Sequence, residues 1–213
     1  ARQADYDFTR RAPGVMLPYQ QRWIADKSQV KVHEKSRRVG LSWAEAADAA
    51  LEAAASSGQD VWYIGYNKDM AIEFILDVAQ WAVHFNSVAS AIECGEEMFK
   101  DGDEEKSVLT YSIRFASGNR VTALSSRPAN LRGKQGRVII DEAAFHTSLP
   151  ELLKAAFALL IWGGSVHVIS THDGVGNAFN ELIGEIRAGR KPYSLHRTTF
   201  KGAIEEGLYR RVC

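Results

Sequence analysis

The chain has little cysteine, no net charge and no long apolar run, and each shortage excludes a class of protein. Its two cysteines, Cys94 and Cys213, lie far apart in sequence and make no disulfide framework, which suits a reducing compartment. Basic and acidic side chains each number 26, so the formal net charge is zero and no global field draws the chain to nucleic acid. Any contact with DNA must therefore use a local basic patch or neighbouring subunits.

The apolar runs are too short for a membrane protein. None approaches the roughly 20 residues that a membrane span requires. The chain begins Ala-Arg-Gln-Ala-Asp, which contains no apolar signal core. We therefore expect a cytoplasmic protein with no membrane contact.

The length of 213 residues fits one large α/β domain with a substantial core. Residues 1–16 are polar and include Pro13-Gly14, so we expect an N-terminal arm there and one domain over residues 17–213. The sequence lacks an initiator methionine and stops in a helical pattern at Cys213. These features predict a domain cut from a longer protein.

Residues 35–42, with the sequence KSRRVGLS, lie at a predicted strand-to-helix turn. Val30 and Val32 alternate before this turn as in a strand, and apolar residues at helical spacing follow it as far as Gly58. Such a turn points free backbone N–H groups and a helix dipole outward. This arrangement suits a phosphate group.

The same residues match the phosphate-loop pattern G-x-x-x-x-G-K-[ST] only in part. Gly40 stands at the second glycine and Ser42 at the hydroxyl that binds Mg²⁺. Lys35 replaces the first glycine, and Leu41 replaces the lysine. The ammonium group has thus moved to the start of the loop, where we expect it to contact the phosphates.

Asp141 and Glu142 follow an apolar run, residues 138–140, as when a buried strand brings acids to the end of a sheet. The first carboxylate can order Mg²⁺, and the second can accept a proton from an attacking water. Alternatively, the pair only supplies negative charge to the start of a helix. The phosphate loop upstream favours the roles in metal binding and proton transfer.

Four motifs, taken together, resemble those of phage terminase large subunits, especially the lambda and Mu-like branches. Residues 35–42 resemble their variant phosphate loop, residues 138–145 (VIIDEAAF) their Walker B segment, and residues 170–172 (STH) their coupling motif. Tyr19-Gln20 stands where the family has its adenine-reading motif. The resemblance extends from about residue 17 to residue 205 and does not include the family's C-terminal nuclease.

The resemblance implies a P-loop NTPase of the RecA/ASCE-like class, with a mainly parallel sheet flanked by helices and with ATP and Mg²⁺ as ligands. It implies an ATP-hydrolysing motor domain that drives DNA into a viral procapsid, without nuclease activity in this chain. The implied partners are double-stranded DNA, the portal protein and the small terminase subunit. The implied assembly is a ring of copies during packaging, or a monomer when the domain is isolated.

Two other functions stay open. A helicase-like ATPase core shares these early motifs but needs a second motor lobe. A non-hydrolysing nucleotide-binding scaffold is the other alternative, because Leu41 replaces the usual lysine.

The expected nucleotide-binding residues are Tyr19, Gln20, Lys35, Ser36, Arg37, Arg38, Val39, Gly40, Leu41, Ser42, Thr171 and His172. Ser42 and Asp141 are expected to hold Mg²⁺, and Glu142 to deprotonate water. The catalytic arginines are expected to be Arg37 within its own chain and Arg132 in the site of a neighbour.

Two of these assignments have ordinary structural alternatives. Gln20 can donate to and accept from an adenine edge while Tyr19 or Trp23 covers the face of the base. Otherwise, Gln20 is a surface residue at a helix start. Thr171 and His172 end a strand and can sense the γ-phosphate, whereas a lone histidine more often serves packing.

Strands and helices alternate along the chain, which predicts a parallel sheet with right-handed crossovers. Residues 107–115 and 120–125 predict an antiparallel β-hairpin, and the acidic residues 93–106 a solvated loop. The basic, glycine-rich residues 128–136 are expected in a loop at the carboxyl edge of the sheet. Residues 202–212 predict a last helix.

Overall fold

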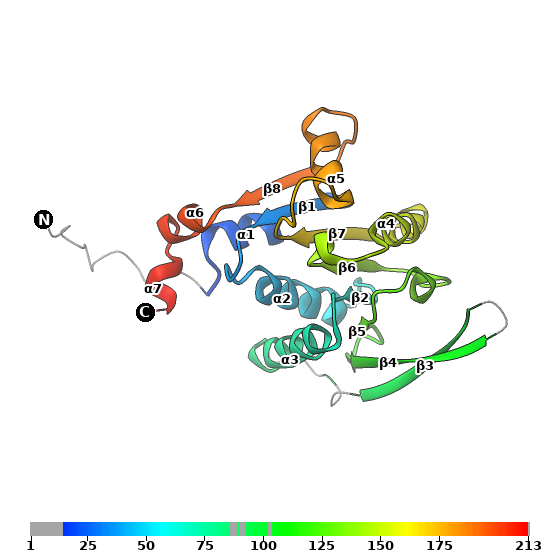
Figure 1. Cartoon of the computed structure of the whole chain (residues 1–213). Helices are drawn as coiled ribbons and strands as arrows, with labels where there is room; N and C mark the ends of the chain where they lie inside the picture. The colour runs from blue at the N-terminus through cyan, green and yellow to red at the C-terminus, as the bar shows by residue number, and fades with distance from the viewer. Residues whose placement is uncertain (1–14, 86–88, 90–92, 102–103, 213) are drawn as a thin grey trace, which may run out of the picture.

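The computed structural model describes residues 15–85, 89, 93–101 and 104–212, whose strands form a single sheet. The strands are β1 (Val30–Lys35), β2 (Val61–Ile64), β3 (Glu93–Asp101), β4 (Glu104–Arg114), β5 (Arg120–Leu124), β6 (Arg137–Asp141), β7 (Ser165–Ser170) and β8 (Ser194–Thr198). Their order in the sheet is β3-β4-β5-β2-β6-β7-β1-β8 (Figure 1). The strands from β5 to β8 in this order run parallel, and β4 is antiparallel to both of its neighbours.

Helices cover both faces of the sheet (Figure 1). The α-helices are α1 (Pro18–Ala25), α2 (Leu41–Ala54), α3 (Lys68–His84), α4 (Leu149–Phe157), α5 (Ala178–Arg187), α6 (Phe200–Glu205) and α7 (Leu208–Val212). The 3₁₀ helices are η1 (Pro128–Leu131), η2 (Ala143–Phe145) and η3 (Ala158–Trp162).

Side chains that alternate along each strand divide the core into two layers. Tyr63 and Ile139 pack with α1, α2 and α3, whereas Ile64 and Ile140 pack with α4 and α5. The central strands are therefore buried on both faces, as in other parallel sheets with helical crossovers. This arrangement confirms the predicted fold class, a mainly parallel sheet flanked by helices, with an added antiparallel hairpin.

The acidic segment 93–106 contributes to two strands, so the prediction of a solvated loop there was wrong. β3 pairs with β4 from Glu93 opposite Ser112 to Asp101 opposite Glu104. An antiparallel ladder is made by backbone groups, and edge strands accept charged residues, so an acidic composition does not prevent pairing. The hairpin predicted between 107 and 125 is confirmed as β4 and β5.

The chain after residue 200 forms two short helices where one was predicted. α6 and α7 are separated at Gly207, which has a φ of 105°. A positive φ cannot continue an α-helix, and glycine adopts it without a steric cost from a side chain.

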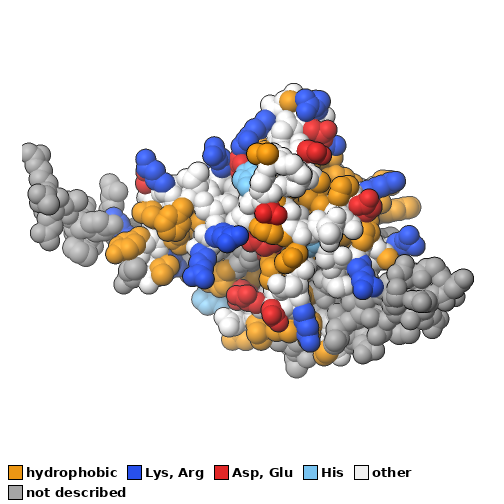
Figure 2. All heavy atoms as spheres, in the orientation of Figure 1, with side chains coloured by type: hydrophobic (Ala, Val, Ile, Leu, Met, Phe, Trp, Pro, Cys, Tyr) orange, Lys and Arg blue, Asp and Glu red, His pale blue; other side chains and the backbone are white. Residues whose placement is uncertain are grey.

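Charged side chains are spread over the surface seen in Figure 2, and Lys and Arg do not gather in one patch on this face. An apolar group lies over α6 and α7, where Phe200, Tyr209 and Val212 are exposed. Among the helices that the structure describes, none has the length and hydropathy that crossing a membrane requires.

Candidate active site

The turn between β1 and α2 has two residues in the left-handed region of backbone conformation. Arg38 has a φ of 57° and Gly40 a φ of 68°. The turn reverses the chain between Lys35, the last residue of β1, and Leu41, the first residue of α2. Because the first N–H groups of a helix have no partner within the helix, this geometry offers donors and a positive dipole end to an anion.

Helix α1 is hydrogen-bonded to this turn. The Gln20 side chain accepts a hydrogen bond from the backbone N–H of Leu17 (2.8 Å) and donates one to the carbonyl of Gly40 (2.7 Å). The Tyr19 hydroxyl donates to the carbonyl of Val39 (2.5 Å). Burial raises the pKa of Tyr19 to about 12, so the hydroxyl stays a donor over the physiological pH range. These bonds attach helix α1 to the turn at the carbonyls of Val39 and Gly40.

The rings of Tyr19 and Trp23 are closed into the core, with 2% and 0% of their surfaces exposed. The expectation that one of them covers an adenine face therefore does not fit this structure. Both ends of the Gln20 amide are engaged within the protein, and the assignment of Gln20 as an adenine reader stays a prediction.

Asp141, at the carboxyl end of β6, is held by donors from three parts of the chain. Its Oδ2 accepts from the Ser42 hydroxyl (2.5 Å) and the Tyr63 hydroxyl (3.1 Å), and its Oδ1 accepts from the N–H of Glu142 (2.8 Å). Burial raises the pKa of Asp141, and the Lys35 ammonium and the Ser42 hydrogen bond oppose this rise. Burial also raises the pKa of Tyr63 well above its usual value, and the Asp141 carboxylate adds to the effect.

Glu142 contacts the ends of two further strands. Its Oε1 lies 2.7 Å from Nζ of Lys35, and its Oε2 lies 3.2 Å from Oγ1 of Thr171. The residue has a left-handed φ of 48°, which is uncommon for a residue with a side chain. Such backbone conformations concentrate at functional sites, where the surrounding structure maintains them. The two predicted acids and the predicted cation thus meet at one point.

Three other predicted residues lie apart from this point. His172 bonds Glu34 (2.9 Å between Nε2 and Oε2), and Ser36 accepts from the N–H of Phe200 (2.9 Å). Arg37 is exposed. Their roles in nucleotide binding stay predictions.

A cavity of about 370 Å³ opens between the turn, the acids and helix α3. It is lined by Lys35, Arg38, Val39, Gly40, Leu41, Ser42, Trp43, Tyr63, Met70, Glu73, Phe74, Asp77, Asp141 and Glu142. Sequence reasoning missed the residues from β2 and α3. The hydrophobic pattern of these two segments indicated only a buried strand and an amphipathic helix. No local sequence motif predicts which strand lies beside β6.

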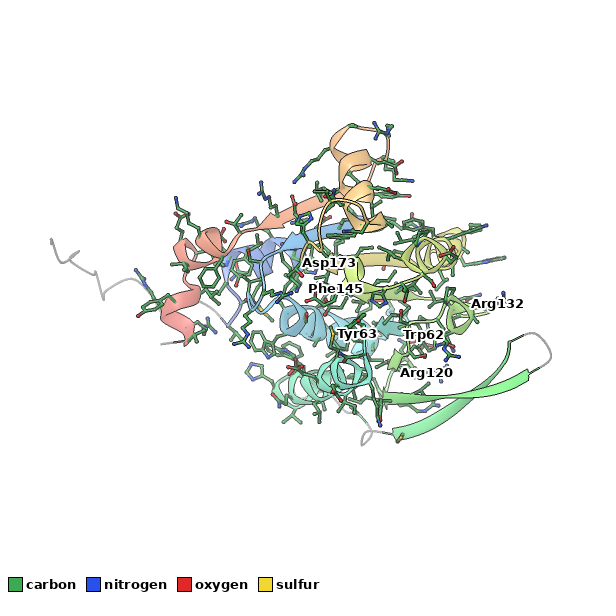
Figure 3. The ribbon with its side chains drawn as sticks, viewed as in Figure 1. Trp62, Tyr63, Arg120, Arg132, Phe145 and Asp173 are labelled. Atoms are coloured by element: carbon green, nitrogen blue, oxygen red, sulfur yellow. The ribbon has the colours of Figure 1, made fainter. Side chains whose placement is uncertain are left out.

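Arg132 lies far from this cavity in the same chain (Figure 3). The loop 128–136 starts near the carboxyl end of β5, but it then crosses to the amino ends of β2 and β6. There the indole N–H of Trp62 donates to the carbonyl of Gln135 (2.7 Å), and the N–H of Arg137 donates to Asp60 (2.9 Å). The prediction that the whole loop lies at the carboxyl edge was therefore wrong. Because β5 and β6 run in the same direction, the chain must return to the amino ends of the strands before β6 begins.

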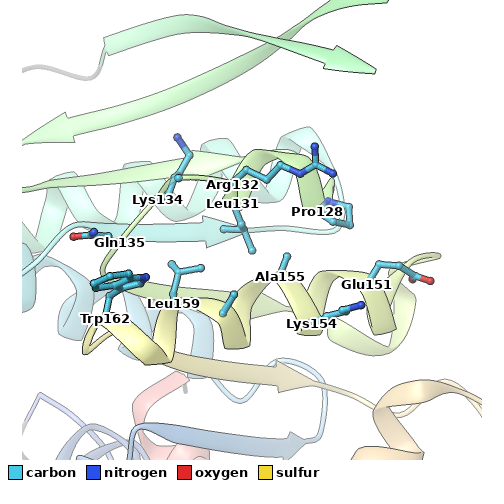
Figure 4. Close-up of a pocket in the computed structure, with 12 residues that line it drawn as sticks. Pro128, Leu131, Arg132, Lys134, Gln135, Glu151, Lys154, Ala155, Leu159 and Trp162 are labelled. Carbon is cyan, nitrogen blue, oxygen red and sulfur yellow. The ribbon is translucent and has the colours of Figure 1, made fainter. Parts of the chain in front are cut away.

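Arg132 borders a second, larger hollow of about 640 Å³ between this loop and α4–η3 (Figure 4). Leu131, Ala155 and Leu159 contribute apolar surface, and Lys134, Lys154 and Glu151 contribute charge. Trp162 is 73% exposed at one end.

A buried charged cluster lies between α2 and the sheet. Glu45, with no exposed surface, accepts from the Trp23 indole and from Nδ1 of His167 (2.5 Å). Asp48 accepts from Nη1 of Arg137 (2.8 Å). Glu45, Asp48 and His167 have potential metal-ligand atoms within 4.8 Å of one another, but arginine and histidine already pair with the two acids. The cluster is therefore a structural network that joins α2 to the sheet.

Comparison with known proteins gives two close relatives and several similar folds, whereas no family model matches the chain. The Mu-like prophage FluMu protein gp28 of Haemophilus influenzae is 57% identical over 202 residues, which are 93% of this chain and 39% of the relative. The probable terminase large subunit gp28 of Escherichia phage Mu is 54% identical over 203 residues, which are 93% of this chain and 37% of the relative. The chain thus spans about two fifths of the length of these relatives.

Solved large terminases have a similar fold. The Thermus phage P74-26 large terminase ATPase domain has a TM-score of 0.61 and 20% identity, over 91% of this chain and 86% of that one. The large terminase of a thermophilic bacteriophage, in complex with ATP-gamma-S, has a TM-score of 0.61 and 13% identity, over 91% of this chain and 46% of that one.

The fold and the cavity define a P-loop-type α/β domain, of the kind found as the ATPase domain of large terminases. The two relatives indicate which group of phage proteins this chain resembles in sequence. Over the two fifths of their length that it spans, the chain is similar to the gp28 proteins of phage Mu and of a Mu-like prophage, the first of which is described as a probable terminase large subunit.

Proposed function

We propose that this chain is the ATP-hydrolysing motor domain of a terminase large subunit and that it powers the packaging of double-stranded DNA into a procapsid. The meeting of Lys35, Glu142 and Thr171 with the Ser42–Asp141 pair at one cavity is the observation that supports this most directly. A similar fold in a large terminase binds ATP-gamma-S.

The phosphates of ATP are proposed to lie on the turn at residues 36–40, against the first N–H groups of α2. Lys35 supplies the cation, because its side chain is 6% exposed and ends at the cavity, whereas Leu41 has no charge. When the ammonium contacts phosphate, its bond to Oε1 of Glu142 weakens. One carboxylate oxygen then becomes available to a water molecule.

Mg²⁺ fits the donor set of this cavity. The Ser42 hydroxyl and the Asp141 carboxylate lie 2.5 Å apart, and oxygen donors of these two kinds are preferred by this ion. When bound, the ion neutralises charge on the phosphates. Ser42 and Asp141 are therefore proposed as the residues that hold it.

Glu142 is proposed to orient the attacking water and to accept its proton. Thr171 contacts the same carboxylate through Oγ1 (3.2 Å) and through its backbone N–H (3.4 Å). A change at the phosphate position can thus reach the end of β7 through Glu142. His172, beside it, bonds Glu34 on β1, which extends this path toward the neighbouring strand.

The proposed partners are double-stranded DNA, the portal protein, the small terminase subunit and further copies of the chain. Arg37 is proposed to act within its own chain, and Arg132 in the site of a neighbouring copy. The remote position of Arg132 within one chain favours the second role, because the residue can reach a nucleotide only across an interface.

The replacement Glu142→Gln tests the function. It removes the proton acceptor but keeps the shape of the side chain, so we expect ATP binding close to wild type and hydrolysis slower by about 100-fold or more. Equilibrium binding of a fluorescent ATP analogue and phosphate release measure the two effects separately.

The exposed Glu181, on α5, provides the control, and Glu181→Gln is expected to leave both quantities unchanged. Wild-type chain that binds ATP but shows no turnover at any concentration, with or without DNA, would favour the non-hydrolysing scaffold. Normal hydrolysis by Glu142→Gln would contradict the role of this residue.

A further inference from the structure

Tyr63 is the donor to Asp141 that comes from outside the phosphate loop and the acidic strand. Its hydroxyl lies 3.1 Å from Oδ2, the same oxygen that accepts from Ser42. Tyr63 stands on β2, opposite Ile139 of β6, so its side chain reaches Asp141 across the strand pair. The ring is 1% exposed and lies between the cavity and the core.

Two neighbours determine where this hydroxyl lies. The ring of Phe74 stacks on that of Tyr63, with centroids 3.7 Å apart and an angle of 9° between the planes. Gly65 leaves room beside the ring, because a Cβ at this position would stand 3.0 Å from Cε1 of Tyr63 and 3.2 Å from Cβ of Met70. The ring is thus confined by α3 on one face and by the start of the β2–α3 connection at its edge.

The two oxygens of the Asp141 carboxylate have different hydrogen-bond donors. Oδ1 is occupied by the N–H of Glu142, and Oδ2 receives both hydroxyls. Without the Tyr63 hydroxyl, the buried carboxylate loses a donor, and only Ser42 still holds Oδ2 toward the loop. A carboxylate with fewer hydrogen bonds samples more orientations and is a poorer ligand.

We propose that Tyr63 is a positioning residue for the metal-binding carboxylate: its hydroxyl holds Oδ2 of Asp141 toward Ser42, so that the two oxygens can bind Mg²⁺ together. This inference rests on the proposed function, because it assumes that nucleotide binds here with Mg²⁺. It extends that function to β2 and α3, which carry none of the recognised motifs.

The replacement Tyr63→Phe tests the inference, because it keeps the ring and the stack on Phe74 and removes only the hydroxyl. Binding of a fluorescent ADP analogue is measured at increasing Mg²⁺ and again in the presence of a chelator. We expect the Mg²⁺ concentration for half-maximal enhancement of binding to rise about ten-fold, since a hydrogen bond to a charged group is among the stronger ones. Binding in the chelator should not change.

Tyr66→Phe is the matched control, because it removes a tyrosine hydroxyl from the exposed end of the same strand region, where the ring is 51% exposed. We expect its Mg²⁺ titration to match wild type. Gly65→Ala offers a second variant that leaves every polar group in place and displaces the Tyr63 ring. It should shift the Mg²⁺ titration in the same direction as Tyr63→Phe.

The outcomes separate this inference from the proposed function. A wild-type chain whose ADP binding does not respond to Mg²⁺ contradicts the proposed function itself. A clear response in wild type, unchanged in both Tyr63→Phe and Gly65→Ala, overturns the role of Tyr63 alone. Equal losses of binding with and without Mg²⁺ would show that the ring only supports the cavity wall, which also overturns it.

Discussion

Lys35 is proposed to replace the phosphate-loop lysine from a different position in the chain. The usual phosphate-loop lysine comes from the first turn of the helix, where this chain has Leu41. Lys35 instead comes from the last residue of β1, and its ammonium lies 2.7 Å from Glu142. Because the end of β1 and the start of α2 border the same cavity, a cation from either side can reach a bound phosphate.

Lys35→Ala should weaken binding of ATP by at least about ten-fold and reduce hydrolysis further. The change removes the cation and also leaves Glu142 without its charged partner. Arg38→Ala is the comparison, because Arg38 borders the same cavity and is exposed. Titration with a fluorescent ATP analogue and phosphate release measure both variants. Near-normal values for Lys35→Ala, together with loss in Arg38→Ala, would transfer the role to Arg38.

At the scale of elements, α3 has a role in the site that its amphipathic pattern does not show. Its buried face packs Phe74 on Tyr63, while Glu73 and Asp77 border the cavity. Burial raises the pKa of Asp77 to about 6, and the negative charge of Glu73 adds to this rise. The helix therefore carries a carboxylate that opposes folding when it is ionised.

Asp77→Asn should make the chain without nucleotide more stable at pH values near 8. Between about pH 4 and pH 6, the folded state binds more protons at this carboxyl than the unfolded chain does, so stability falls as the pH rises through this window. Removing the charge should raise the free energy of unfolding by about 1 kcal/mol above the window, after allowance for solvent screening. Below about pH 4 the gain should disappear.

Urea unfolding at about pH 8 and about pH 4 measures this difference. Asp173→Asn is the control, since it makes the same change at an exposed position. It should alter stability little at either pH. An equal gain at both pH values for Asp77→Asn would show that the effect comes from packing and not from ionisation.

At the scale of the whole molecule, the position of Arg132 predicts that catalysis needs more than one chain. The residue borders the hollow between its loop and α4–η3, and none of the residues that line this hollow lines the proposed nucleotide cavity at the carboxyl ends of β1 and β6. An arginine supplied by a partner can contribute about 10³-fold or more to turnover. We therefore expect weak activity that rises with protein concentration.

Mixing two inactive variants tests this expectation. Arg132→Ala chains and Glu142→Gln chains should each be nearly inactive, and their mixture should regain activity at interfaces that combine an intact Arg132 with an intact Glu142. Phosphate release is measured at concentrations where wild-type chains associate. Arg190→Ala, at an exposed position on the α5–β8 connection, is the control. We expect this variant to hydrolyse ATP at the wild-type rate without being mixed with another variant.

A mixture no faster than its components, under conditions where wild-type chains associate, would contradict the role between chains. Arg37, an exposed residue of the turn, would then be the remaining candidate for the catalytic arginine. The test is specific for exchange between chains because neither variant alone contains a complete site.

The sequence alone predicted the parts of this protein that depend on local order. The turn between β1 and α2, the acids after β6 and the alternation of strands and helices were all evident, since each is encoded by residue type and period over a few positions. The hairpin of β4 and β5 was predicted for the same reason. The strand β3 was missed, because its pairing depends on a partner and not on its own composition.

Only the tertiary structure decided which distant residues share the site. Ser42 and Asp141 are 99 positions apart, and Tyr63 and Asp141 are 78 positions apart, yet both pairs are hydrogen-bonded. Arg132, only a few residues before β6, borders a hollow that shares no lining residue with the cavity at the end of that strand. In a parallel sheet, neighbouring strands come from separate parts of the chain, and each strand separates the loop before it from the loop after it. Distance along the sequence therefore does not predict proximity in space, and strand order decides which side chains meet.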